Sequence, residues 1–79
     1  MRLDKFLKVS RLIKRRTIAN EACDAGRILV SGKPARASYD VKVGDIIEVT
    51  IGKPMKVRVL SVSEYATKEN ASTLYEILP

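Results

Sequence analysis

Seven cationic side chains within the first sixteen residues are the clearest candidates for a chemical role in this chain. Asp4 is the one acid among them, so residues 1–16 have a net charge of +6. Residues 17–79 contain eight basic and eight acidic residues, and the net charge of the chain therefore arises at one end. Like charges crowded in this way weaken a compact fold, which favours an anionic partner over simple solvation. The candidate binding residues are Arg2, Asp4, Lys5, Lys8, Arg11, Lys14, Arg15 and Arg16.

The type of cation indicates phosphate as the ligand. Four of the seven bases are arginine, whose planar fork of N–H donors matches phosphate geometry. Nucleic acid is the leading partner, with an anionic membrane surface or an acidic protein as alternatives. The aromatic residues are Phe6, Tyr39, Tyr65 and Tyr75. Phe6 belongs to the expected core stripe and the three tyrosines lie outside the basic run, which argues against a stacking platform for single strands and favours structured RNA read by backbone and shape.

The remaining residue types argue against catalysis and metal binding. The chain has no histidine, so the commonest general base is absent, and one cysteine without histidine leaves no zinc site. We expect Cys23 to lie in the core, and a single thiol agrees with a reducing cytoplasm. No apolar run approaches the roughly 20 residues that span a bilayer. We therefore predict a protein that is not an enzyme, with no cofactor, no metal and no membrane partner.

Two short helices must position the basic residues. Apolar residues at helical spacing predict a helix over 2–9, with Leu3, Phe6 and Leu7 buried and an end near Val9 or Ser10. A second helix is predicted from about Arg16 to Ala25, followed by Gly26 as a C-terminal stop. The linker, residues 10–15, should pack Leu12 and Ile13 between the helices. On the second helix the expected apolar face is Ile18, Ala19, Ala22 and Cys23, with Asn20, Glu21 and Asp24 in solvent.

After Gly26 the apolar pattern alternates, which indicates strands. Strands are expected at 27–31, where Ile28 and Val30 share one face, and at 46–51, 55–62 and 73–78, with turns at 31–34 and 41–45 and a polar loop at 64–72. Seventy-nine residues leave room for one domain, residues 1–79. The predicted fold class is α+β, with two N-terminal helices in a helix-linker-helix motif packed on a small, mostly antiparallel sheet.

Four blocks, in this order, carry a family resemblance: residues 2–7 (RLDKFL), 15–16 (RR), 25–33 (AGRILVSGK) and 43–49 (VGDIIEV). Together they resemble the RNA-binding domain first described in ribosomal protein S-four, over residues 1–51, with extra C-terminal strands over 55–79. Within that family the chain is similar to the small, free-standing RqcP-like group in its length and in the ending Leu74-Tyr75-Glu76. A heat-shock protein that binds stalled large ribosomal subunits is a relative of this group.

The resemblance implies a role in ribosome-associated quality control. RqcP-like proteins bind the large ribosomal subunit (23S rRNA) and peptidyl-tRNA on obstructed subunits, and support an RqcH-like factor in alanine tailing of the nascent chain. The family's RNA-facing positions fall on Arg2, Lys5 and Arg16, with Asp4 beside them. Off the ribosome we expect a monomer. The alternative is a general ribosome- or structured-RNA-binding protein without a role in tailing.

Two positions need comment beside the resemblance. The family often has Ser or Thr before the corner arginine, where it can cap the second helix, whereas this chain has Arg15. Asp4 has two interpretations: a first-turn acid that suits the helix dipole, or a carboxylate that orients Arg11 or Arg16 for phosphate contact. The long basic C-terminal extension of the heat-shock relative has no counterpart in the printed sequence, which favours the RqcP-like assignment.

Overall fold

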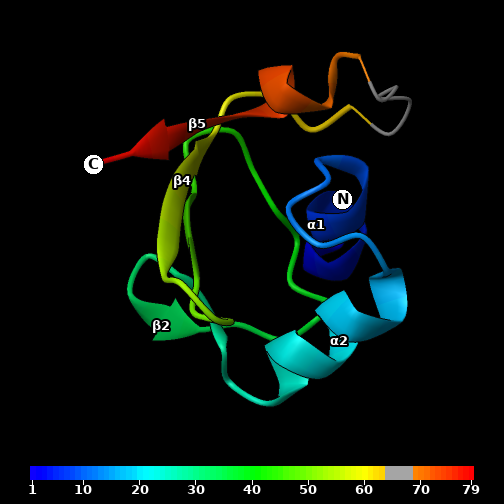
Figure 1. Ribbon diagram of the computed structural model, residues 1–79, viewed down its shortest axis with the longest axis vertical. Coiled ribbons are helices and arrows are strands. Elements are labelled where there is room, and N and C mark those ends of the chain that lie inside the picture. Colours follow the sequence, from blue (N-terminus) through cyan, green and yellow to red (C-terminus); the bar gives the residue numbers. More distant parts are fainter. Residues whose placement is uncertain (64–68) are drawn as a thin grey trace.

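The computed structural model describes residues 1–63 and 69–79, and it begins with two short helices (Figure 1). Helix α1 spans Leu3–Val9 and helix α2 spans Arg16–Asp24. The predicted stripe of Leu3, Phe6 and Leu7 is fully buried, because residues three and four apart share one helix face. Gly26 follows α2 with φ +76°, the left-handed conformation expected of a helix stop.

The predicted apolar face of α2 is partly wrong. Ala19, Ala22 and Cys23 are buried as expected, but Ile18 is 45% exposed and Asn20 is half-buried. Ile18 and Asn20 lie about 100° to either side of Ala19, at the two borders of the face. Since the Asn20 border turns toward α1, the polar residue is the one that becomes covered.

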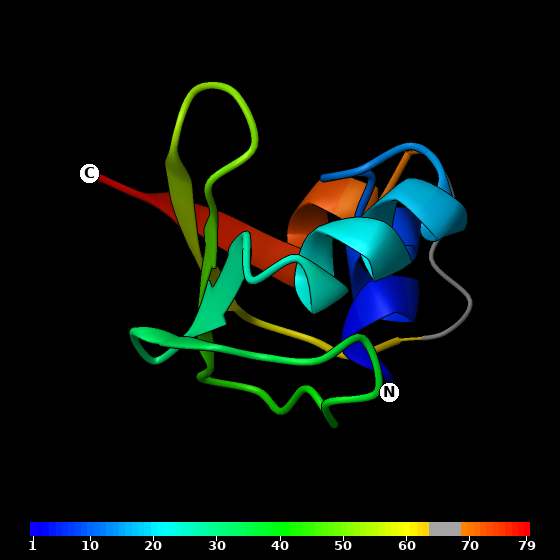
Figure 2. The same cartoon turned by 90° about the horizontal axis from the view of Figure 1, so that it is seen from below.

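The five strands form one antiparallel sheet, and both helices lie on the same side of it (Figure 2). The spatial order is β2-β1-β3-β4-β5, and alternating apolar residues of the central strands face the helices. This arrangement confirms the predicted α+β class with two helices on an antiparallel sheet. The strands are β1 Ile28–Val30, β2 Lys33–Pro34, β3 Ile46–Val49, β4 Met55–Val59 and β5 Tyr75–Leu78.

Several strand boundaries differ from the prediction. Lys33 and Pro34, expected in a turn, pair with Val30 and Leu29, which leaves the turn to the two residues between the strands. Strands β3 and β4 end earlier than expected, at Val49 and Val59. Residues 71–74 form a 3-10 helix, η1, so Leu74 belongs to neither a loop nor a strand. Its side chain is 2% exposed and its carbonyl accepts the N–H of Leu60, which fixes this turn to the core. Residues 64–68, including Tyr65, lie outside the described part of the chain.

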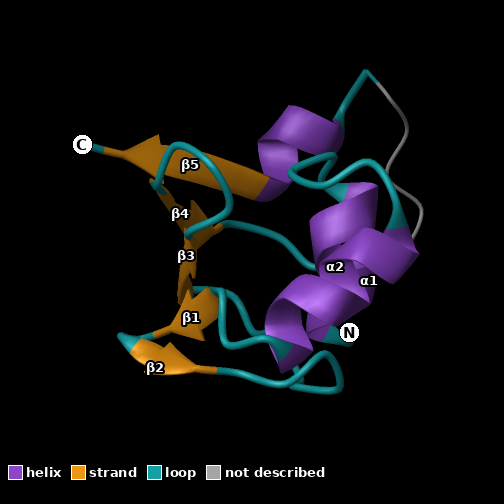
Figure 3. Cartoon of the chain, turned by 60° about the horizontal axis from the view of Figure 1, so that its bottom comes forward, coloured by secondary structure: helices purple, strands orange, loops and turns teal. Residues whose placement is uncertain are grey.

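A long loop after β2 holds the start of α1 in place (Figure 3). The backbone N–H of Leu3 donates to the carbonyl of Tyr39 at 2.8 Å, and that of Val41 donates to Met1 at 2.8 Å. The Met1 amine also lies 2.9 Å from the Asp40 carboxylate. These contacts tie the first basic residues to the sheet layer, so their directions are set by the fold. Within the described residues, no helix has the length and apolar character needed to cross a bilayer.

Candidate nucleic-acid interface

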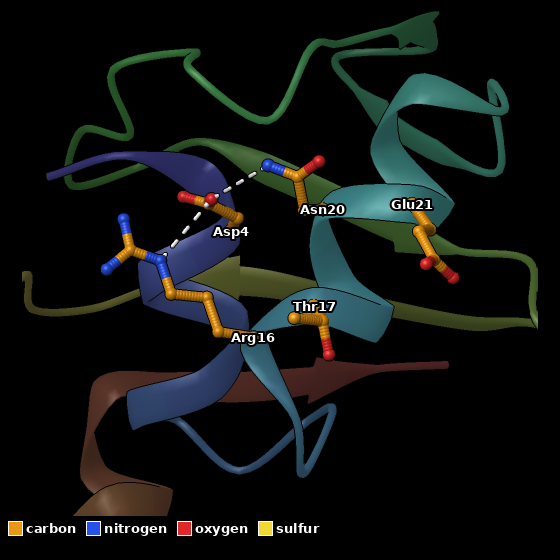
Figure 4. A pocket seen from close by; sticks show the side chains of 5 residues that line it. All are labelled: Asp4, Arg16, Thr17, Asn20 and Glu21. Carbon is orange, nitrogen blue, oxygen red and sulfur yellow. Dashed lines mark hydrogen bonds and ion pairs between the residues drawn. The ribbon is translucent and has the colours of Figure 1, made fainter.

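A buried carboxylate organises the corner between α1 and α2. Asp4 is 2% exposed, and its Oδ1 accepts the backbone N–H of Lys5 at 2.8 Å and the Nε of Arg2 at 3.2 Å. Its Oδ2 accepts Nδ2 of Asn20 at 3.2 Å and lies 3.4 Å from Nε of Arg16. Figure 4 shows Asp4 between the side chains of Arg16 and Asn20, both from α2. Residues from both helices thus meet at one anion.

The two arginines at this carboxylate remain accessible. The side chains of Arg2 and Arg16 are 52% and 46% exposed, whereas that of Asp4 is 3% exposed. One carboxylate charge compensates only one of two guanidinium charges, so the corner stays positive. A guanidinium has five N–H donors. The contacts with Asp4 use the Nε and Nη2 groups of Arg2 and the Nε group of Arg16. The geometry therefore holds two arginines in fixed positions with donors left for a phosphate.

The ionised form of Asp4 is the stable one in the fold. Burial by itself raises its pKa, but hydrogen bonds from Asn20, Arg2 and Arg16 outweigh this effect and hold the pKa below its usual value. Asp4 thus carries a full negative charge at neutral pH. Asp4 lies in the first turn of α1 and contacts Arg16, so both interpretations stay open: an acid that suits the helix dipole, or a carboxylate that orients an arginine for phosphate contact. The other arginine that contacts Asp4 is Arg2, and not Arg11, which the sequence offered as an alternative to Arg16.

We expect acid to weaken the fold partly through Asp4. Because its folded pKa lies below the unfolded value of about 3.9, the carboxylate contributes stability that is fully present above the unfolded pKa. That stability is lost as the pH falls through the folded pKa. The melting temperatures of the native chain and of Asp4→Asn should therefore converge as the pH is lowered from about 6 to below 3. A difference that stays constant over this range would contradict an ionised Asp4.

A shallow hollow opens beside the corner. It has a volume of about 340 Å³ and is lined by Asp4, Arg16, Thr17, Asn20 and Glu21 (Figure 4). Asn20 is the partner of Asp4 that sequence reasoning missed, since it was expected in solvent. A signal was present, because Arg16 and Asn20 are four residues apart on α2 and share one face.

The other predicted site residues do not gather at Asp4. Lys8, Arg11 and Lys14 line a separate hollow of about 320 Å³ together with Val9, at the end of α1 and along the linker. Arg15 is the N-cap residue of α2 and makes no side-chain capping hydrogen bond, so the missing Ser or Thr is not replaced. Lys5 is half-buried next to Asp4. The basic run of the sequence is thus divided in space.

A third group of polar residues was not singled out from the sequence. Lys33 and Arg36 line a hollow of about 460 Å³ that also includes Tyr39. Charge counting does not reveal these cations, because acids balance them along residues 17–79. The Tyr39 hydroxyl donates to Asp45 at 3.0 Å; burial and this bond both raise the pKa of Tyr39. Among the described residues, no cluster of His, Cys, Asp and Glu could hold a metal ion, and Cys23 is a buried free thiol.

Two short helices with a basic corner, packed on an antiparallel sheet, define the class of domain by its architecture, and a family model matches this part of the chain. The model described as "S4 domain" matches residues 1–47. The RQC P-site tRNA stabilizing factor of Halalkalibacterium halodurans is 56% identical over 78 residues, covering 98% of this chain and 89% of that protein. Its counterpart in Bacillus subtilis is 54% identical, covering 99% and 92%. The chain therefore belongs to the S4 domain family, in the group of RQC P-site tRNA stabilizing factors, which confirms the predicted family.

Heat-shock relatives share the fold at lower identity. The trimeric structure of heat shock protein 15 of Vibrio cholerae matches with a TM-score of 0.92 and 25% identity, covering 99% of this chain and 81% of that one. The heat shock protein 15 homolog of Aeromonas salmonicida is 35% identical, covering 96% of this chain and 59% of that protein. The predicted relation to the heat-shock protein is thereby confirmed.

Proposed function

We propose that this protein is a non-enzymatic, cytoplasmic RNA-binding factor of ribosome-associated quality control. It binds the large ribosomal subunit through 23S rRNA and holds the peptidyl-site tRNA on obstructed subunits. In that position it supports RqcH-dependent alanine tailing of the stalled chain. The proposal draws on the high identity to proteins named RQC P-site tRNA stabilizing factor.

The observation that carries the proposal is the pair of half-exposed arginines fixed by one buried carboxylate. Arg2 immediately precedes α1 and Arg16 is the first residue of α2, yet both contact Asp4. Holding them in place before binding reduces the side-chain entropy lost when a phosphate is contacted. Such contacts recognise the backbone and shape of folded RNA rather than base edges. A tRNA on a ribosomal RNA surface is a ligand of this kind.

The proposed interface includes the rest of the basic run. Residues 1–79 act as one RNA-binding domain and as a monomer off the ribosome. The first group of contacts is Arg2 and Arg16, which contact Asp4, together with Lys5, whose backbone N–H donates to Asp4. Lys8, Arg11, Lys14 and Arg15 add positive charge along the end of α1 and the linker, which raises the rate of encounter with RNA.

Sedimentation of cell extract through a sucrose gradient tests the ribosomal role. We expect the tagged protein to migrate with free large subunits, and its share there to rise when the subunits carry peptidyl-tRNA. Raising the salt should release it, because neutralised phosphates regain their counterions.

The same gradient separates the alternatives. Equal association with small subunits, large subunits and bulk RNA would contradict the proposal and favour a general structured-RNA binder. The phosphate-directed arginines are the observation that favours this second candidate, since they read no base. Deletion of the RqcH-like factor serves as the control: alanine tails should vanish while large-subunit binding remains.

A further inference from the structure

The two helices end with similar left-handed turns but use different residues for them. After α2, Gly26 has φ +76° and donates its N–H to Cys23 at 3.0 Å. After α1, Arg11 takes the equivalent place with φ +62° and donates its N–H to Lys8 at 3.0 Å. This position after a helix is usually glycine, because a Cβ is strained there. Arg11 is thus held in a conformation that glycine adopts without strain, which points to a use for its side chain.

The left-handed turn at Arg11 brings three cations around one hollow. Lys8 precedes the turn and Lys14 follows it, and both line the same space of about 320 Å³ as Arg11. Within the described residues, none of the three forms an ion pair with a carboxylate. The arginines at Asp4 differ in this respect, because they share a partner. The hollow therefore concentrates positive charge that no described acid offsets.

Most of the carbonyl groups at the C-terminal end of α1 are hydrogen-bonded, so they oppose an anion in this hollow only weakly. The C-terminus of a helix carries partial negative charge on unbonded carbonyls. Here the carbonyls of Phe6, Leu7 and Lys8 accept hydrogen bonds from the backbone N–H groups of Ser10, Ile13 and Arg11, at 2.9, 3.0 and 3.0 Å. The hydroxyl of Ser10 donates to Leu7 as well, at 3.3 Å. Since three of the last four carbonyls of α1 are occupied, the helix end presents less partial negative charge to the hollow.

We propose that this hollow binds one phosphate group of an RNA backbone, and that Arg11 occupies a glycine position because its guanidinium is needed for that contact. The inference rests on the proposed function only in taking RNA as the source of the phosphate. The site lies apart from the Asp4 corner, so the protein holds RNA at two separate places.

The chain offers a matched control for Arg11. Ser31, in the turn between β1 and β2, is the other non-glycine residue with positive φ among the described residues, at φ +54°, and it is exposed. We expect Arg11→Gly and Ser31→Gly each to raise the melting temperature by about 4 °C, because each relieves the same backbone strain. Affinity for deproteinised 23S rRNA at low salt should fall roughly tenfold in Arg11→Gly and stay unchanged in Ser31→Gly. Unchanged RNA affinity in Arg11→Gly would overturn the inference, as would an equal loss in both variants.

Double variants test whether the three cations share one phosphate. Lys8→Ala and Lys14→Ala should each weaken binding, and each combined with Arg11→Gly should lose less than the product of the single losses. Independent, multiplicative losses would show three separate contacts and overturn the shared site. Inorganic phosphate provides the second arm: if it raises the melting temperature of the native chain while Arg11→Gly keeps full RNA affinity, the hollow takes a free ion and the RNA assignment is wrong. A chain that binds 23S rRNA through this hollow without preferring large subunits would contradict the proposed function alone.

Discussion

Replacing Arg16 by alanine should weaken binding to large ribosomal subunits by roughly ten- to a hundredfold while the fold persists. A charge-assisted contact to phosphate contributes about 1–3 kcal/mol, and about 1.4 kcal/mol corresponds to a tenfold change in affinity. The side chain of Arg16 is 46% exposed, so its removal opens no cavity in the core. Asp4 retains Arg2, Asn20 and the N–H of Lys5 as partners in this variant. Alanine tailing in cells should be lost.

Arg58 provides the matched control for Arg16. It is an arginine with 50% side-chain exposure that pairs with a carboxylate, Glu76, at 2.6 Å, and it lies on strand β4. Arg58→Ala removes the same charge from the opposite face of the sheet, so a general electrostatic effect would appear in both variants. Co-sedimentation with purified large subunits should show a loss for Arg16→Ala alone. Similar losses in both, or normal tailing in Arg16→Ala, would contradict a local contact at the Asp4 corner.

The second large effect concerns Asp4, because its loss removes the common partner of several groups. Asp4→Ala leaves Arg2 and Arg16 close together without the shared anion, and it takes the acceptor from Asn20. Breaking a buried ion pair by removing one partner typically costs 3–5 kcal/mol. Since both arginines are half-exposed and water can solvate them, we expect a smaller loss, about 2 kcal/mol. For a small domain that is a sizeable part of the whole stability.

Asp4→Asn and Asp4→Lys separate the charge of this residue from its shape. Asparagine keeps one acceptor oxygen, so urea unfolding should give a loss of about 1 kcal/mol. A lysine places a third cation against two arginines and should weaken large-subunit binding well beyond the effect of asparagine. Binding should be compared at a temperature at which circular dichroism shows that each variant is folded. Equal binding by folded Asp4→Asn and Asp4→Lys would show that Asp4 serves the helix rather than the orientation of the arginines.

Local patterns predicted much of the fold because they depend on neighbours along the chain. The stripe of Leu3, Phe6 and Leu7 predicted α1, and Gly26 predicted the end of α2. The alternation of residues after Gly26 predicted that Ile28 and Val30 lie on one face of a strand, and both are buried. The boundaries near Leu74 were wrong because this residue is buried in the core and its carbonyl accepts the N–H of Leu60, which are tertiary contacts that the local pattern does not contain. The left-handed turn at Arg11 also escaped prediction, since the residue type there argues against it.

The sequence by itself determined the segregation of charge, the two-helix and antiparallel-strand architecture, and the family. These properties follow from residue types and spacings, which need no knowledge of packing. Only the tertiary structure decided how the basic run divides: Arg2 and Arg16 gather at Asp4, while Lys8, Arg11 and Lys14 line a separate hollow. It also decided that Asn20 joins the corner and Ile18 does not. The physical reason is that packing between the two helices decides which side of α2 faces α1. The spacing of apolar residues within α2 gives the centre of its apolar face but does not tell its two borders apart.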